Sequence, residues 1–243
     1  MIAVTFALPA ESSDFIRILQ DRSRETLASL QIIRGQLGET EVCVFHTGVG
    51  TKMARARSKS FLARAPRPEL LICAGFAGAL EERLQIADLF LADNFSDESA
   101  LTSARQIIPA EVGKLTTAEE ILDSPAARSR LASATGARAI DMETEVVVEE
   151  CRGVGVRTLS LRAITDTPAF PFPLPPSILF DLAAQKTKPL RLLAYLAVHP
   201  WAIGRLIAFA GRVTRARRAL TNALELLVRR AGDPPVPREP GHR

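Results

Sequence analysis

The chain has 243 residues and a mass of 26.4 kDa, which fits one α/β domain or a domain with an appendage. Hydrophobic residues make up 47% and aromatic residues 5% of the chain, so we expect a sizeable core of Leu, Val, Ile and Ala. The formal net charge is +4, but much of the arginine follows Leu190, where almost no aromatic side chains are available to stack on bases. This distribution argues against a nucleic-acid-binding protein.

The first 92 residues alternate apolar strands with helices. Strands are predicted over residues 2–8, 41–46, 69–74 and 86–92, and helices over residues 11–20 and 51–65. Ser12, Ser13 and Asp14 supply capping chemistry for the first helix. Near-continuous apolar strands that alternate with helices predict a mostly parallel sheet with helices on both faces.

A glycine turn, Thr47–Gly50, follows the strand over residues 41–46, and the strand over residues 69–74 enters the glycine-containing segment Gly75–Leu80. The helix after the turn would offer its N-terminal N–H groups to an anion or a ligand hydroxyl. The turn has neither the third glycine of a dinucleotide fingerprint nor the GK[ST] of a P-loop. The glycines therefore indicate a ligand site without naming the ligand.

The middle of the chain is less regular. Residues 94–103 are polar and predict a loop, residues 106–110 and 112–115 are ambiguous, and residues 117–122 and 125–134 have helical patterns. Residues 139–166 then read as an acidic pair, a helix, a glycine turn and an apolar strand over 156–164. This order places Glu143 at a helix start and Asp166 at a strand end, where ligand-binding groups converge in α/β folds.

The composition changes after Asp166. Residues 167–176 are rich in Pro and Phe and predict a loop or lid, residues 177–230 read as helical with a break at His199-Pro200, and residues 232–243 predict a disordered tail. The apolar run 190–213 contains several arginines, so it is not a spanning helix. We expect an α/β domain over 1–176, C-terminal helices over 177–231 and a tail over 232–243.

Localisation is predicted from the first residues of the chain and from cysteine usage. The first 13 residues have no basic region and too short an apolar run for an export signal. Cys43, Cys73 and Cys151 lie in apolar segments without CxxC spacing, so buried thiols in a reducing cytosol are expected. We predict a cytoplasmic protein without a metal or a cofactor.

Four motifs in this order resemble the nucleoside phosphorylase/nucleosidase superfamily, and within it the methylthioadenosine/S-adenosylhomocysteine nucleosidases. They are the opening strand with Glu11, HTGVG at His46–Gly50, AGFAGAL and IAD within Ala74–Asp88, and DMETE and LRAITD within Asp141–Asp166. The resemblance implies a three-layer α/β/α sandwich around a mixed, mostly parallel sheet, in a homodimer or higher homo-oligomer. The segment His199–Leu220 is similar to hopanoid-biosynthesis members, which remove adenine from adenosylhopane.

The resemblance also implies roles for individual residues. Met142 and Glu143 would hold the ribose, Asp166 would act as general acid on N7 of the purine, and Glu11 would activate the attacking water. The predicted substrate-binding segments further contain Gly48, Gly75, Phe76, Ile121 and Leu122.

The chemistry of N-glycosidic cleavage gives these carboxylates distinct tasks. An acid that protonates the leaving base needs a raised pKa, whereas an ionised Glu143 would offset positive charge on the sugar. Each residue also has a structural interpretation. Glu11 would interact favourably with the dipole of its helix, and Glu143 would lie on a solvated helix face. Asp166 would cap the following turn, and Met142 would pack in the core. The joint order of the motifs favours the enzyme.

Two departures from the family pattern affect the reaction. Phe76 occupies a position where many members have a small hydroxyl residue, and Ile72 and Cys73 stand where some phosphorylases have a phosphate-binding arginine. With Glu11 present, these features favour hydrolysis, although phosphate stays open as a co-substrate. The segment between Asp88 and Asp141 is short, and a more open 5′ side would suit a large apolar substituent.

Two alternatives remain for the function. If Phe76 has abolished efficient catalysis, the chain would be a non-catalytic nucleoside-binding or membrane-associated member of the same fold. The C-terminal helices combine apolar faces with Arg212, Arg215, Arg217 and Arg218, a pattern that fits peripheral contact with an anionic membrane. Packing on the core or on a partner subunit explains the same pattern equally well.

Overall fold

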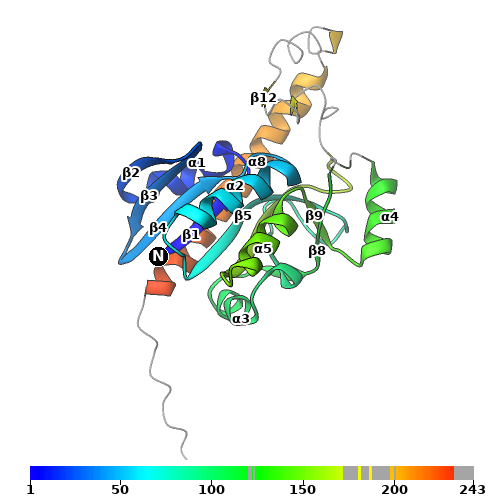
Figure 1. Ribbon diagram of the computed structural model, residues 1–243. Coiled ribbons are helices and arrows are strands. Elements are labelled where there is room, and N and C mark those ends of the chain that lie inside the picture. The colour runs from blue at the N-terminus through cyan, green and yellow to red at the C-terminus, as the bar shows by residue number, and fades with distance from the viewer. Residues whose placement is uncertain are drawn as a thin grey trace, which may run out of the picture.

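The computed structural model describes residues 1–119, 122, 124–171, 180–181, 186–187, 198–199 and 201–232. Its main sheet has ten strands, with the order β2-β3-β4-β1-β5-β10-β6-β7, and β9 and β8 continue from β5 (Figure 1). The strands are β1 (Ile2–Phe6), β2 (Gln20–Leu27), β3 (Leu30–Leu37), β4 (Thr40–His46), β5 (Leu70–Ala79), β6 (Leu89–Ala92), β7 (Glu111–Gly113), β8 (Leu115–Thr117), β9 (Ala139–Asp141) and β10 (Arg157–Asp166).

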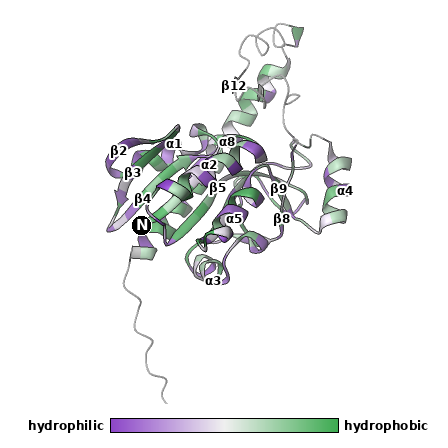
Figure 2. Cartoon of the chain, in the orientation of Figure 1, coloured by the Kyte–Doolittle hydropathy of each residue, from purple (hydrophilic) through white to green (hydrophobic). Residues whose placement is uncertain are grey.

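The centre of the sheet is parallel and buried. Strands β4, β1, β5 and β10 run in the same direction, and Val4 of β1 pairs with Val44 of β4 and Ile72 of β5. The hydrophobic colouring of these strands in Figure 2 reflects their apolar runs. Strands covered on both faces need such continuous apolar sequence, which explains why these four were predictable.

Helices cover both faces of the sheet. The α-helices are α1 (Pro9–Ile18), α2 (Thr51–Arg64), α3 (Glu98–Ile107), α4 (Pro125–Thr135), α5 (Thr144–Gly153) and α8 (Trp201–Gly232). Helices α2 and α5 pack on one face, while α1, α3 and α8 pack on the other. The predicted three-layer sandwich and C-terminal helix are therefore confirmed. Cys43, Cys73 and Cys151 are free and buried, as expected.

The first helix differs from its prediction. It begins at Pro9 and ends at Ile18, because β2 starts at Gln20, and the hairpin β2–β3 had not been predicted. The cap is not supplied by Ser12, Ser13 or Asp14. The Glu11 carboxylate instead accepts the backbone N–H of Leu8 at 2.9 Å.

The strand predicted to end at Ala74 continues through the glycine segment that follows. Strand β5 continues to Ala79 and stays paired with β10, from Leu70–Arg157 to Gly78–Asp166. Glycine is needed here because the Arg162 side chain lies close to the strand: a Cβ on Gly75 would lie 2.5 Å from Nη1 of Arg162. In sequence, glycines that end a strand cannot be distinguished from glycines inside a crowded strand.

Two predictions in the middle of the chain are wrong. The polar segment 94–103 contains a 3₁₀ turn (Asp93–Phe95) and the first part of α3, whose Ala104 is buried against the sheet. The helical pattern 117–122 fails over residues 117–119, because Thr117 ends strand β8, which pairs with β9. Pairing with distant strands overrides the local preference of such short segments.

In the described part of the C-terminal region, the long helix α8 follows residue 200. Helix α8 starts at Trp201, directly after the predicted break, and its second half buries Leu220, Leu224 and Val228 against the sheet. The helical prediction is wrong at β11 (Phe180–Asp181) and β12 (Lys186–Thr187), which pair with each other.

Several predictions near the end of the chain concern residues without a description. Residues 167–171 form neither helix nor strand, in line with the predicted loop, but 172–176 and the tail beyond residue 232 lie outside the described residues. The domain limits stay a prediction. Within the described part of the chain, no helix is both long and apolar enough to cross a membrane.

Candidate active site

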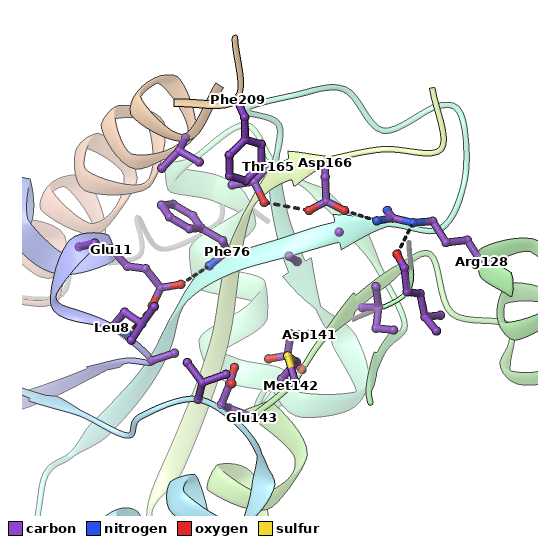
Figure 3. A pocket seen from close by; sticks show the side chains of 18 residues that line it. Leu8, Glu11, Phe76, Arg128, Asp141, Met142, Glu143, Thr165, Asp166 and Phe209 are labelled. Carbon is purple, nitrogen blue, oxygen red and sulfur yellow. Dashed lines mark hydrogen bonds and ion pairs between the residues drawn. The ribbon is translucent and has the colours of Figure 1, made fainter. Parts of the chain in front are cut away.

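A cavity of about 360 Å³ opens at the carboxyl ends of the central strands. Its walls come from the segment after β1, from the ends of β5, β9 and β10, and from α8 (Figure 3). Six of the predicted site residues line it, namely Glu11, Phe76, Leu122, Met142, Glu143 and Asp166. This is the edge at which ligands bind in α/β sheets.

Three other predicted residues do not line the cavity. Gly48 and Gly75 lie directly behind it, each next to a residue that does, Val49 and Phe76. Ile121 lies outside the described residues. The two glycines therefore position neighbouring residues that line the cavity, but do not line it themselves.

Glu11 is held in a fixed orientation by two backbone N–H groups. Its Oε2 accepts from Leu8 at 2.9 Å, and its Oε1 accepts from Phe76 at 3.2 Å. Burial raises the pKa of this carboxyl, while the hydrogen bond from Leu8 and the charge of Arg162 act in the opposite direction. Position 76 thus contributes through its backbone, whatever its side chain.

Glu143 is fixed by the glycine turn that follows β4. The Gly50 N–H donates to its Oε1 at 2.8 Å, and the Gly48 N–H donates to the carbonyl of Ala7 at 3.0 Å. Gly48 and Gly50 have positive φ angles of 76° and 87°, respectively. A residue with a Cβ would adopt such angles only under strain. Burial, with the nearby charge of Asp141, raises the pKa of Glu143 to about 8.

A buried ion pair supports this wall from behind. Arg162 of β10 pairs with Asp141 Oδ2 at 2.9 Å and donates to the Thr144 hydroxyl. Asp141 also accepts from the backbone of Thr144 at 3.0 Å, at the start of α5, and from the hydroxyl of Thr117 at 2.8 Å. Sequence reasoning had missed Arg162. Its signal was a lone arginine inside the apolar strand LSLRAITD.

Asp166 has a partner that sequence reasoning had also missed. Arg128 of α4 is 2% exposed and forms an ion pair with Asp166 Oδ2, while the Thr165 hydroxyl donates to Oδ1 at 3.0 Å. Gly78 makes room for this pair, because a Cβ there would lie 2.8 Å from Oδ2. No pattern in this Arg- and Ala-rich helix distinguished Arg128 from the other arginine, Arg130.

The opposite side of the cavity is apolar. Phe209 and Val213 of α8 line it together with Leu8 and the side chain of Phe76. The guanidinium carbon of Arg212 lies 6.0 Å from the centre of the Phe209 ring. Within the described residues, no group of three or more His, Cys, Asp or Glu is arranged to hold a metal ion.

Comparison with known proteins identifies the family. The profile of the phosphorylase superfamily matches residues 1–106 and 96–184. The chain belongs to this superfamily. The resemblance read from the four motifs is thereby confirmed at the level of the superfamily.

The relatives and structural neighbours of the chain agree with this membership. A 5′-methylthioadenosine/S-adenosylhomocysteine nucleosidase of Staphylococcus aureus is 23% identical over 197 residues, which cover 68% of this chain and 86% of that protein. The S-adenosylhomocysteine nucleosidase of Streptococcus pyogenes superposes with a TM-score of 0.72 at 16% identity and covers 94% and 96% of the two chains. The futalosine hydrolase of Helicobacter pylori superposes with a TM-score of 0.71 at 17% identity, covering 94% and 97%. These findings support an enzyme of the class that cleaves N-glycosidic bonds of nucleoside-like substrates.

Proposed function

We propose that the chain hydrolyses the N-glycosidic bond of an adenosine-type nucleoside that carries a large apolar 5′ substituent. Adenosylhopane is the specific substrate suggested by the resemblance of His199–Leu220 to hopanoid-biosynthesis members. The observation that carries the proposal is one cavity with Glu11 and Glu143 on its sugar side and the Asp166–Arg128 pair at another end. These are the groups that departure of a base requires.

Glu143 is suited to hold the ribose. Its Oε1 is oriented by the Gly50 N–H, and its burial makes an uncompensated negative charge costly. Two ribose hydroxyls that donate to this carboxylate would favour its ionised form. The charge would then stabilise the oxocarbenium-like sugar at the moment when the bond to the base breaks. The thioether of Met142 would contact the same sugar.

Glu11 is suited to act as base toward water. A general base works best when its pKa is near the working pH, and burial moves the pKa of Glu11 upward. Its two backbone donors leave carboxylate lone pairs on the cavity side. A water that gives its proton to Glu11 would attack the anomeric carbon.

Charge in the cavity favours water over phosphate as the nucleophile. Among the described residues that line it, Arg128 is the one cation, and Asp166 already pairs with it. A phosphate dianion beside Glu11 would lie next to a carboxylate, and among the described lining residues no cation other than Arg128 is available to face it. Phosphate is therefore not expected to stimulate the reaction.

The apolar side supports a large 5′ substituent. Phe209 and Val213 would contact the chain attached to C5′, because they face the cavity from α8. The preference is measured as kcat/KM for adenosines with 5′-alkyl groups of increasing length against methylthioadenosine. A strong preference for methylthioadenosine would contradict this part of the proposal.

The decisive experiment is product analysis by mass spectrometry in H₂¹⁸O, with and without phosphate. We expect free adenine and an ¹⁸O-labelled free sugar, and no sugar phosphate. Glu11→Gln, Glu143→Ala and Asp166→Asn should each reduce kcat/KM by at least about 100-fold. Glu82→Gln, at an exposed carboxyl outside the cavity, serves as the control.

The same experiment tests the alternative function. A non-catalytic nucleoside-binding member would bind adenosine analogues but release no adenine from any of them. In that case the three substitutions would change affinity only. Retained turnover in Glu143→Ala and Asp166→Asn would instead show that the cavity is not the active site.

We further propose peripheral contact with an anionic membrane through the first part of α8. Trp201, Ile203 and Ile207 are 63%, 45% and 69% exposed, and Arg205 on the same stretch is also exposed. Apolar side chains with a neighbouring cation suit the boundary between headgroups and acyl chains. Flotation with phosphatidylserine vesicles should be lost in Trp201→Ser/Ile207→Ser and unchanged in Leu226→Ser, at an exposed site far along the helix.

A homodimer or higher homo-oligomer is proposed as well, because the family to which the motifs point is oligomeric. Light scattering coupled to size exclusion measures the mass directly. A particle of about 26 kDa, the mass of one chain, would contradict the proposal.

A further inference from the structure

A serine and a histidine join the helix that carries Glu11 to a nearby strand of the sheet. Ser12 follows Glu11 in α1 and is completely buried. Its hydroxyl oxygen lies 2.8 Å from Nε2 of His46, the last residue of β4. Neither residue lines the cavity. The contact therefore supports the helix of the proposed base without touching the substrate.

The orientation of Glu11 depends on where this helix lies. One carboxylate oxygen accepts from Leu8, which precedes α1, and the other accepts from Phe76 of β5 at 3.2 Å (Figure 3). The second bond joins two elements, so it forms only while α1 keeps its position on the sheet. The Ser12–His46 contact, one residue further along the helix, fixes that position from β4.

His46 is itself held by its neighbours. Nη1 of Arg57 in α2 donates to the carbonyl of His46 at 3.2 Å. His46 is also paired with Phe6 of β1, and the next N–H, that of Thr47, donates to the Phe6 carbonyl at 2.9 Å. The imidazole thus extends from a fixed backbone to the buried hydroxyl on α1.

The hydrogen bonds of Ser12 define which nitrogen of His46 carries a hydrogen. The Ser12 hydroxyl has one hydrogen, which it donates to the carbonyl of Pro9 at 3.2 Å. Its oxygen then accepts from His46 only if Nε2 is the protonated nitrogen. Burial and the charge of Arg57 lower the pKa of His46 to about 4. The ring is therefore neutral at pH 7, with its hydrogen on Nε2.

We propose that His46 is a positioning residue for the reaction, whose Nε2–H holds Ser12 and thereby keeps Glu11 aligned with the attacking water. This inference rests on the proposed function, in which Glu11 is the base. A contribution of the same bond to packing of α1 on the sheet would be structural only. The two roles are distinguishable, because the positioning role disappears once Glu11 can no longer act as a base.

The first test measures kcat and KM of the full-length protein with a 5′-alkyl adenosine. His46→Leu should lower kcat by about tenfold or more, because small displacements of a catalytic group are costly. The KM should stay within about twofold, since His46 does not line the cavity. His46→Gln, whose amide N–H group can take the place of Nε2–H, should stay within about threefold of the wild-type kcat.

The partner serine supplies a matched control. Ser12→Ala should lower kcat as His46→Leu does, and the double variant should lose no more than either single variant, because both remove the same contact. Ser13→Ala removes a similar helical bond, from the Ser13 hydroxyl to the carbonyl of Ala10 at 3.3 Å. It should keep the wild-type kcat.

The comparison that separates the two roles uses Glu11→Gln as the background. There His46→Leu should change the residual single-turnover rate by less than about twofold. A tenfold loss in this background as well would show that His46 only supports the fold, and would overturn the proposal. A wild-type kcat in His46→Leu, or a kcat in His46→Gln as low as in His46→Leu, would also overturn it.

A second measurement needs no substitution and holds even if His46→Leu does not fold. Wild type is labelled with ¹⁵N at histidine, and the chain has three histidines to assign by NMR. At pH 7 we expect a hydrogen on Nε2 of His46 and none on Nδ1, and a hydrogen on Nδ1 would overturn the proposal. Failure of the proposed function is a different result, in which His46 has the expected tautomer but wild type cleaves no nucleoside.

Discussion

Arg162 and Asp141 form a buried ion pair, 2.9 Å between Nη2 and Oδ2, beneath the wall that carries Glu143. The pair joins β10 to the end of β9 and, through the Thr144 backbone, to the start of α5. Both side chains are almost completely shielded from water, 4% and 1% exposed. The position of Glu143, which we propose binds the ribose, therefore depends on this buried ion pair.

Arg162→Met is expected to lower the free energy of unfolding by about 3–5 kcal/mol, because it leaves Asp141 buried without its partner. The kcat/KM should also fall, since the start of α5 would lose its anchor. Urea unfolding and adenine release measure the two effects. Arg157→Met, at the exposed first position of the same strand, is the matched control and should stay within about 0.5 kcal/mol of wild type. Equal effects of the two substitutions would contradict the role of the ion pair.

Glu143 should make stability depend on pH. Its pKa in the folded state is about 8, above the ordinary value of 4.5. Between these two values the folded state binds more protons than the unfolded state, so stability falls as the pH rises from about 5 to about 8. Glu143→Gln cannot ionise, and its stability relative to wild type should increase over this range by an amount on the order of 3 kcal/mol.

Urea unfolding at pH 5, 7 and 9 measures this difference. Glu145→Gln, at an exposed carboxyl in the first turn of the same helix, should show no comparable trend. A gap between Glu143→Gln and wild type that is constant across pH would mean that Glu143 ionises normally. In every case Glu143→Gln should lose kcat/KM, because the amide cannot balance positive charge on the sugar.

The sequence revealed the acidic groups of the site better than the basic ones. Glu11, Glu143 and Asp166 stand at strand ends and helix starts, where the chain order alone indicates convergence. Arg128 lies in the first turn of helix α4, whose other arginine, Arg130, is exposed, and its burial results from contacts with Ala79 and Asp166, far away in sequence. Such a partner becomes visible only when the strands are assembled.

The same reasoning explains which elements were predictable. The strands β1, β4 and β10 are covered on both faces, so their apolar runs are diagnostic. Strand β2 is exposed along nearly its whole length, strand β3 and helix α3 each present one face to water, and the polar residues of β2 and α3 resemble a loop. The strand β5 was predicted to end before its glycines, although these glycines lie within the strand and allow Arg162 and Asp166 to approach it.

Gly78 should be required for the polar end of the cavity. A Cβ at this position would lie 2.8 Å from Oδ2 of Asp166 and 3.1 Å from Nη1 of Arg128. Gly78→Ala would therefore displace the ion pair, and we expect kcat/KM for adenosine analogues to fall by about tenfold or more. Gly153→Ala, where an added Cβ meets no atom within 4 Å, should leave kcat/KM unchanged. Wild-type activity in Gly78→Ala would show that the pair tolerates displacement.

Phe209 should control the length of the 5′ substituent. It lines the cavity from α8 with Val213, next to Thr165 and away from Glu143 (Figure 3). Phe209→Ala removes apolar contact area, so KM for a 5′-octyl adenosine should increase by about tenfold, as expected for loss of roughly 1–2 kcal/mol of apolar contact. The KM for adenosine itself should change by less than about twofold, because adenosine lacks the apolar 5′ chain that we propose Phe209 contacts. Phe170→Ala, at an exposed ring near Arg212, serves as the control. An equal change in KM for both substrates would mean that Phe209 shapes the cavity as a whole and does not select the 5′ group.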